Sequence, residues 1–325
     1  MSVQKTAIDW LRYRTQADVL PGLEALRPLY GHLGSTLRLE HLEKGKDGFQ
    51  QASVVKLADL AVGRVDFGGE SQRGWVRWNL TGQGCEWVKD WDAVESLEAL
   101  PEAEIRRVDV ALTTWKGEVG HETIEAAHGA GLFTCGGRPP NLQRILNSNP
   151  RAGSTCNVGK RDADKFFRGY EKGFEMAAKF GLGDSVTHID GFPIEGIYRC
   201  EVELKADARV LPWEIIGRRD QYFAGCYPFL AALLPDTESD ILMRRPERAP
   251  QLDLAAALAN CRIQYGATLL TALHAYHGDI GQVWDQILGR EHNHALVAAG
   301  VLMVEHHEST RVDLLEKALQ SAGVR

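Results

Sequence analysis

Three segments of the chain have the pattern of β-strands, in which successive side chains alternate between two faces. In the first, Val108, Val110 and Leu112 share one face, and Asp109 lies on the other. The other two segments are 166–172 and 198–205. Strands with one apolar and one polar face are typical of antiparallel sheets, so these segments constrain the fold most strongly.

Further strands and helices are expected around these segments. Alternating runs at 62–67 and 75–80 predict two more strands, and helical spacing is present at 121–131 and after 172. The order predicts an α+β fold with mostly antiparallel sheet and flanking helices. Strands followed by a helix at 50–100, and again at 104–185, suggest a pseudo-duplicated strand–helix unit.

The character of the chain changes after about residue 211, where strand patterns give way to helical ones. A stretch rich in proline and arginine, 243–250, is typical of a connector. We therefore predict one domain over residues 1–244 and a helical C-terminal region over 245–325. Helical segments in the second part are expected at 252–258, 268–276 and 280–288.

Charge and cysteine usage narrow the class of protein. The 325 residues carry a net charge of −7, which argues against a protein that coats DNA nonspecifically. The six cysteines form no CxxC pair, and the N-terminus has no apolar signal segment. No apolar run approaches the roughly 18 residues of a membrane helix. We expect a reduced, cytoplasmic protein that does not bind membranes.

Basic residues gather in one part of this acidic chain. Between positions 138 and 172, eight basic residues face three acidic ones, a local charge of +5 (8 − 3). Such segregation is expected of a phosphate-binding surface, although a solvated basic face gives the same pattern. The basic residues are Arg138, Arg144, Arg151, Lys160, Arg161, Lys165, Arg168 and Lys172.

The polar faces of the alternating segments carry residues suited to phosphate chemistry. Glu201 and Glu203 share a face about 7 Å apart, so their repulsion calls for a divalent cation or a basic neighbour. Tyr170 has Arg168 and Lys172 on its own face, and two cations would lower the pKa of the phenol and hold a phosphate for attack. Ordinary cross-strand ion pairs are the alternative interpretation.

Five segments resemble, in order and spacing, the replication initiation factor family, which comprises rolling-circle replication initiators of filamentous phages and small plasmids. The resemblance extends over about residues 5–245, and the Tyr-Glu-Lys-Gly sequence ending at Gly173 favours the phage-type branch. The matching segments are IDWLRYRT (8–15), TGQGCEW (81–87), RRVDVALTTWKGE (106–118), GSTCNVGKRDADKFFRGYEKG (153–173) and IYRCEVELKAD (197–207).

The resemblance implies a nicking–closing enzyme that cleaves one DNA strand at an origin and stays joined to the 5′ phosphate through a tyrosine. Tyr170 would be this nucleophile, with Arg168 and Lys172 contacting phosphate. Asp109 and Glu201 would be metal ligands and Glu203 a second-rank candidate; oxygen donors suit Mg²⁺ or Mn²⁺. Further DNA contacts would come from Lys160, Arg161, Lys165, Arg199 and Lys205.

The implied partner is origin DNA, either single-stranded or supercoiled duplex. No GxxxxGK[ST] motif is present, so a host helicase is expected to open the duplex, and the family suggests a homodimer. Two departures from the family stand out. Thr113 and Thr114 replace an acidic residue that many members carry, and Gly169 replaces a common β-branched residue.

Two other functions fit the same motifs. A relaxase of a mobilisable element would use the same chemistry at a different origin, and a catalytically inactive origin-binding or repressor protein would retain only the fold. Four of the eight tryptophans could stack on unpaired bases, with core packing as the alternative. They are Trp75, Trp78, Trp87 and Trp91.

Overall fold

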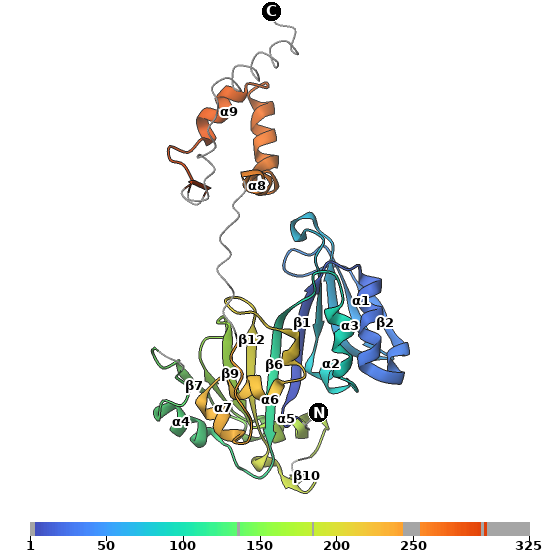
Figure 1. Cartoon of the computed structure of the whole chain (residues 1–325), viewed down its shortest axis with the longest axis vertical. Helices are drawn as coiled ribbons and strands as arrows, with labels where there is room; N and C mark the ends of the chain where they lie inside the picture. Colours follow the sequence, from blue (N-terminus) through green and yellow to red (C-terminus); the bar gives the residue numbers. More distant parts are fainter. Residues whose placement is uncertain (1–3, 135–136, 184, 243–253, 294–295, 298–325) are drawn as a thin grey trace, which may run out of the picture. The chain divides into compact units, whose positions relative to one another are not determined.

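The computed structural model describes residues 4–134, 137–183, 185–242, 254–293 and 296–297. The chain forms two compact units, Met1–Arg245 and Pro246–Arg325. The first unit is an α+β structure built on one large antiparallel sheet, which confirms the predicted fold class (Figure 1).

The N-terminal half of this unit contributes five strands. Its opening strand, β1, leads into a helix and a 3-10 segment, and four strands then follow as an antiparallel meander. The sequence had indicated only part of this meander, because β2 and β3 carry mixed patterns. The elements are β1 (Ala7–Thr15), α1 (Val19–Leu26), η1 (Arg27–Thr36), β2 (Leu37–Leu42), β3 (Gln51–Leu57), β4 (Leu60–Phe67), β5 (Val76–Leu80), α2 (Gly82–Glu86) and α3 (Glu95–Glu98).

The C-terminal half repeats this plan. A long opening strand, β6, is followed by a helix, a three-stranded meander and a final strand that returns beside β6. A short hairpin, β10 (His188–Ile189) and β11 (Phe192–Pro193), precedes the final strand. The main elements are β6 (Glu104–Thr114), α4 (His121–Gly129), β7 (Leu142–Ile145), β8 (Thr155–Val158), β9 (Lys165–Tyr170), α5 (Lys172–Lys179), β12 (Tyr198–Lys205), α6 (Arg219–Ala224) and α7 (Pro228–Leu233).

The strand order shows an approximate two-fold relation between the halves. Among the described residues the sheet has ten strands in the order β2-β3-β4-β5-β1-β6-β12-β9-β8-β7. The order is the same in each half when it is counted outward from the β1–β6 junction, where Arg12 is paired with Arg107. The predicted pseudo-duplication is therefore present in the topology.

One face of the sheet is apolar and carries the helical layer. Trp78 and Phe167 are fully buried on it, and the same core cluster contains side chains from α1, α4, α6 and α7. The rings of Tyr13 on β1 and Trp213, which follows β12, lie 5.7 Å apart in an edge-on contact. We call the opposite side the polar face; charged side chains of β1, β5, β6, β9 and β12 lie there.

The second unit is helical where the structure describes it. It contains α8 (Leu254–Ala275) and α9 (Ile280–Ile287), which cover much of the helical segments expected there; residues 252 and 253 lie outside the described part. Asp279 caps α9 by accepting a hydrogen bond from the Gln282 backbone amide. No helix in the described part of the chain is both long enough and apolar enough to span a membrane.

Candidate functional site

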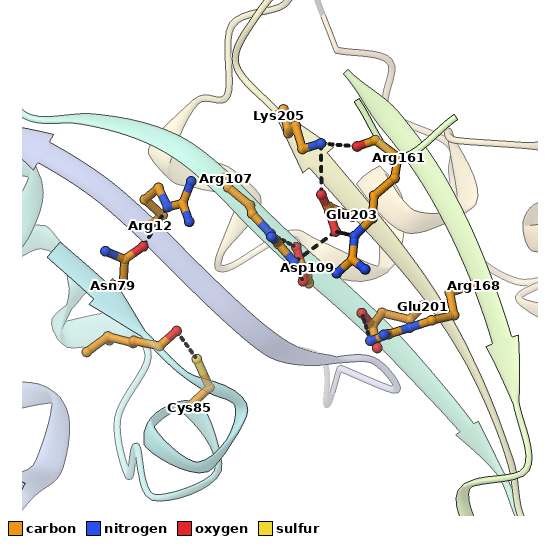
Figure 2. A network of polar contacts seen from close by, with 11 residues as sticks. Arg12, Asn79, Cys85, Arg107, Asp109, Arg161, Arg168, Glu201, Glu203 and Lys205 are labelled. Atoms are coloured by element: carbon orange, nitrogen blue, oxygen red, sulfur yellow. Dashed lines mark hydrogen bonds and ion pairs between the residues drawn. The ribbon is translucent and has the colours of Figure 1, made fainter. Parts of the chain in front are cut away.

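The three alternating segments are neighbours in the sheet, with β12 between β6 and β9. Asp109 on β6 is paired with Glu203, and Glu201 is paired with Arg168 on β9. Tyr170 is the last residue of β9 and is paired with Arg199. The polar face of three adjacent strands therefore brings together the residues that the sequence had singled out. Figure 2 shows the carboxylates among them, Asp109, Glu201 and Glu203.

Arginine joins two of the three predicted metal ligands. Arg107 donates to both oxygens of Asp109, at 2.8 and 2.6 Å, and lies 2.8 Å from Glu203. Glu203 also has the Lys205 ammonium group at 3.0 Å and the Arg161 guanidinium at 3.9 Å. Burial raises the pKa of Asp109, although Arg107 acts in the opposite direction. Asp109 and Glu203 thus form a cation-compensated cluster.

Glu201 differs from the other two carboxylates because one of its oxygens has no partner. Arg168 donates to Oε1 at 2.7 Å, while Oε2 is buried without any hydrogen bond. Burial raises the pKa of Glu201 to about 7, with Arg168 opposing it and the charges of Asp9 and Asp109 adding to it. A buried, unpaired carboxylate oxygen in a negative environment is suited to a hard cation.

The structure describes no group of three or more acidic, histidine or cysteine side chains placed to hold a metal ion. The ligand set Asp109, Glu201 and Glu203 therefore stays a prediction. The orphaned oxygen of Glu201 is the feature of the described structure that fits a cation there.

Tyr170 is held at the end of its strand, almost buried. The Arg168 guanidinium lies 5.2 Å, and the Lys172 ammonium group 5.7 Å, from the centre of its ring. Lys172 is the first residue of α5 and not part of the strand, so its predicted position on the strand face was wrong although it still contacts the ring. Tyr170 lines a pocket of about 240 Å³ together with Ser154 and Glu171.

The expected lowering of the phenol pKa is also corrected by the structure. Burial is the largest influence and raises the pKa of Tyr170 above its ordinary value. Arg199 acts in the opposite direction, whereas the carboxylates of Glu201, Glu175 and Asp9 add to the effect of burial. The sequence showed the nearby cations but could not show that the side chain is only 8% exposed.

Asp9 is a fourth carboxylate at this site, and the sequence reasoning missed it. The β1–β6 register shifts between Ile8 and Trp10, so Asp9 lies at a bulge and escapes the alternation rule. Arg199 donates to Asp9 Oδ1 at 2.6 Å and to Thr113 Oγ1 at 3.0 Å. Asp9 therefore lies close to Thr113, where the family pattern had called for an acid.

The predicted DNA-contact residues separate into two groups. Lys160 and Arg161 are exposed after β8, and Lys205 reaches Glu203 and the Arg161 carbonyl on the same side. Lys165 instead donates to the Cys226 carbonyl and lies 4.0 Å from the centre of the Tyr227 ring. The structure thus directs Lys165 toward the segment that precedes α7 and away from Tyr170.

Gly169 is explained by close packing behind Tyr170. A Cβ atom at this position would lie 2.4 Å from Ile124 Cδ1 and 2.9 Å from the Tyr198 hydroxyl. That hydroxyl is fixed by a hydrogen bond of 2.9 Å with His121 Nδ1. Tyr198 and Ile124 fill the space that a β-branched side chain would need, so the departure from the family pattern is matched by its neighbours.

One family model matches part of this chain. Residues 103–241 match the family model described as replication initiation factor. The match includes Asp109, Tyr170 and Glu201, and it supports a role in the initiation of replication. The segments 8–15 and 81–87 lie outside it, and the phage-type branch stays a prediction.

A solved structure is also similar to this chain. It is described as a rolling circle replication initiator protein from Geobacillus stearothermophilus, with 22% sequence identity and a TM-score of 0.49. The similarity covers 77% of this chain and 89% of that one. No curated protein matches the chain.

Proposed function

We propose that this protein is a rolling-circle DNA replication initiator that nicks and rejoins one strand at an origin through Tyr170. The observation that carries the proposal is the surroundings of this tyrosine. It lines a pocket at the end of β9, with Arg168 and Lys172 over its ring and Arg199 paired with it on β12. The family match over residues 103–241 supports the role in replication initiation.

The proposed reaction is a transesterification. The Tyr170 oxygen attacks the phosphorus in line, so that a bond from Oη to phosphorus forms as the bond from phosphorus to the 3′ oxygen breaks. The phenol loses its proton to solvent and the leaving 3′ oxygen takes one up. The phosphotyrosine keeps the ester bond, so rejoining needs no ATP. Arg168, Lys172 and Arg199 would neutralise the charge on the phosphate oxygens.

A divalent cation, Mg²⁺ or Mn²⁺, would polarise the phosphodiester when bound. We propose Glu201 and Asp109 as its ligands, because Glu201 has a free buried oxygen and the two charges act on each other. Asp9 is added to this set, and Glu203 is kept as a second-rank ligand because three cations already contact it. Because Arg107 donates to Asp109, the cation would have to displace Arg107 from this carboxylate when it binds.

The test is a search for a covalent adduct. The full chain is incubated with supercoiled DNA carrying its own origin and Mn²⁺ or Mg²⁺, and denaturing gels with peptide mapping locate any bound DNA. We expect an adduct on Tyr170, which Tyr170→Phe abolishes and the control Tyr276→Phe in the second unit keeps. An adduct in the Tyr170→Phe variant, or binding without nicking in both metals, would contradict the proposal.

The proposed partners follow from the chemistry. Origin DNA is the substrate, and a host helicase is proposed to separate the strands after the nick. A relaxase would give the same adduct, so replication of a plasmid bearing the origin is the measurement that separates these two functions. Copy-number loss on Tyr170→Phe is expected for an initiator. A homodimer is tested by light scattering with and without origin DNA.

A further inference from the structure

A second pocket lies on the polar face across the junction of the two halves, and the proposed nicking reaction assigns no role to it. Its volume is about 340 Å³. Six of the residues around it are basic, two are acidic and two are aromatic. The lining residues are Arg12, Arg14, Asp47, Phe49, Gln72, Trp75, Arg77, Arg106, Arg107, Lys205 and Asp207.

The two-fold relation of the sheet makes this pocket the counterpart of the carboxylate cluster. When Arg12 on β1 is superposed on Arg107 on β6, position 14 corresponds to Asp109. On the neighbouring strand of each half, Arg77 of β5 is paired with Arg14, and Glu203 of β12 is paired with Asp109. The same pair of sheet positions therefore carries two arginines in one half and two carboxylates in the other.

Most of these arginines are held in place by buried or nearby carboxylates. Arg77 contacts Asp66 at 3.0 Å and Asp47 at 2.7 Å. Asp66 is fully buried and also binds Arg64. Arg14 is paired with Glu104. Guanidinium groups held in place in this way are preorganised for phosphate recognition.

Arg12 is the exception. In the described part of the chain it forms no ion pair, and its Nε donates to the neutral Asn79 amide at 2.5 Å. It is half-buried, and burial together with the nearby charges of Arg77 and Arg107 lowers the pKa of its guanidinium, while Asp47 and Asp109 act in the opposite direction. An anion placed in the pocket would remove this repulsion and supply the missing partner of Arg12.

Trp75 provides an aromatic surface at the same pocket. The indole is half-buried, and the Arg14 guanidinium lies 4.0 Å from its ring centre. An aromatic side chain beside a phosphate-binding arginine is the combination found where proteins bind unpaired bases. A base held within a duplex cannot stack on a side chain in this way, so the chemistry favours a single strand.

The pocket also continues into the nicking site. Arg107 and Lys205 line the pocket, and both contact Glu203 in the carboxylate cluster. A bound strand could therefore pass from Trp75 along the polar face toward β12 and β9. We propose that this pocket binds one nucleotide of single-stranded DNA, with its phosphate on Arg12 and its base on Trp75. That this strand is the one to be nicked rests on the proposed function.

The test measures binding apart from chemistry. Fluorescence anisotropy with a labelled single-stranded oligothymidylate is recorded for the full chain carrying Tyr170→Phe, in EDTA, so that no nicking can occur. We expect Arg12→Gln to weaken binding about tenfold and to lower the slope of log affinity against log salt by about 0.7. Trp75→Ala should also weaken binding about tenfold, and Trp75→Phe much less.

Arg38→Gln on β2 is the matched control, because it removes one positive charge from an exposed pair with Asp59. Circular dichroism checks folding, and Trp75→Ala keeps the test valid if Arg12→Gln unfolds the protein. Binding unchanged by both pocket variants overturns the proposal, whether or not the protein nicks DNA. The proposal is also overturned if a duplex of the same sequence, or free thymidine monophosphate, competes as well as the unlabelled single strand. The same holds if Arg38→Gln weakens binding as much as Arg12→Gln.

Discussion

Arg199 lies opposite Tyr170 in the β9–β12 ladder, and its guanidinium reaches past β6 to donate to Asp9 on β1 at 2.6 Å. One side chain thus links the proposed nucleophile to a carboxylate about 160 residues earlier in the chain. Arg199 is also the cation that acts most strongly to lower the pKa of Tyr170.

Arg199→Gln should therefore lower the nicking rate about 100-fold, the loss typical of removing one group that stabilises charge in the transition state. Single-turnover nicking of supercoiled DNA measures this rate. Asp9→Asn keeps a hydrogen-bond acceptor for Arg199 and should raise the metal concentration needed for half-maximal nicking. If Arg199→Gln nicks at the wild-type rate, the proposed role of Arg199 is wrong.

Glu201→Gln should raise the Mn²⁺ concentration required for nicking by at least tenfold, because it replaces the carboxylate that has the unpaired buried oxygen. The amide keeps the size of the side chain and can still accept a hydrogen bond from Arg168. Nicking across a Mn²⁺ titration is the measurement. Glu203→Gln, at the second-rank position, should shift the titration less. Equal metal dependence of Glu201→Gln and wild type would remove Glu201 from the ligand set.

Asp66 should make the N-terminal half sensitive to acid. Burial, the largest influence, would raise the pKa of Asp66, but hydrogen bonds from Arg64 and Arg77 together lower it below its ordinary value of 3.8. The stabilisation that the Asp66 carboxylate gives the folded state is therefore complete above the pKa that Asp66 has in the unfolded chain. It is lost as the pH falls through the lower pKa that Asp66 has in the folded state.

Asp66→Asn should lower the free energy of unfolding by about 3 kcal/mol at pH 7, because it leaves two arginines without their buried partner. The difference from wild type should shrink below about pH 3. Urea unfolding at both pH values measures it, with the exposed Asp162→Asn as control. A difference that stays constant with pH would show that charge at Asp66 is not the cause.

Gly169→Ala should destabilise the protein by about 1–3 kcal/mol, since the new Cβ meets Ile124 Cδ1 and the Tyr198 hydroxyl. Ile124→Val removes the Cδ1 atom and should restore part of the loss in the double variant. Thermal unfolding of the four proteins in this cycle gives the coupling. Additive effects would show that Ile124 is not what excludes a side chain at Gly169.

Alternation along the strands predicted much of the site, because a regular strand fixes which side chains share a face. Asp109 was assigned to the polar face of one strand, and Glu201 and Glu203 to that of another. The β6–β12–β9 order brings the three together with Tyr170. The rule failed where the backbone is irregular. Asp9 is at a bulge, and Lys172 begins a helix.

Properties that depend on distant neighbours were out of reach of the sequence. The direction of the Tyr170 pKa shift follows from burial, which no local pattern reports. The arginine pocket joins residues of β1 and β5 to Lys205 on β12, so neither its charge nor its shape is visible in any single segment. The basic run at 138–172 marked charge in the C-terminal half only.

The β1–β6 ladder joins the two halves in one sheet and so fixes distances across this polar face. Between β5, which carries Arg77, and β9, which carries Tyr170, lie four ladder steps, or ~19 Å at the usual strand spacing. That separation is set by backbone pairing and does not depend on a hinge or loop. A one-residue slip of β1 against β6 would turn Arg12 to the wrong side. The register of β1 against β6, more than any single side-chain contact, would therefore determine where a strand of DNA lies relative to Tyr170.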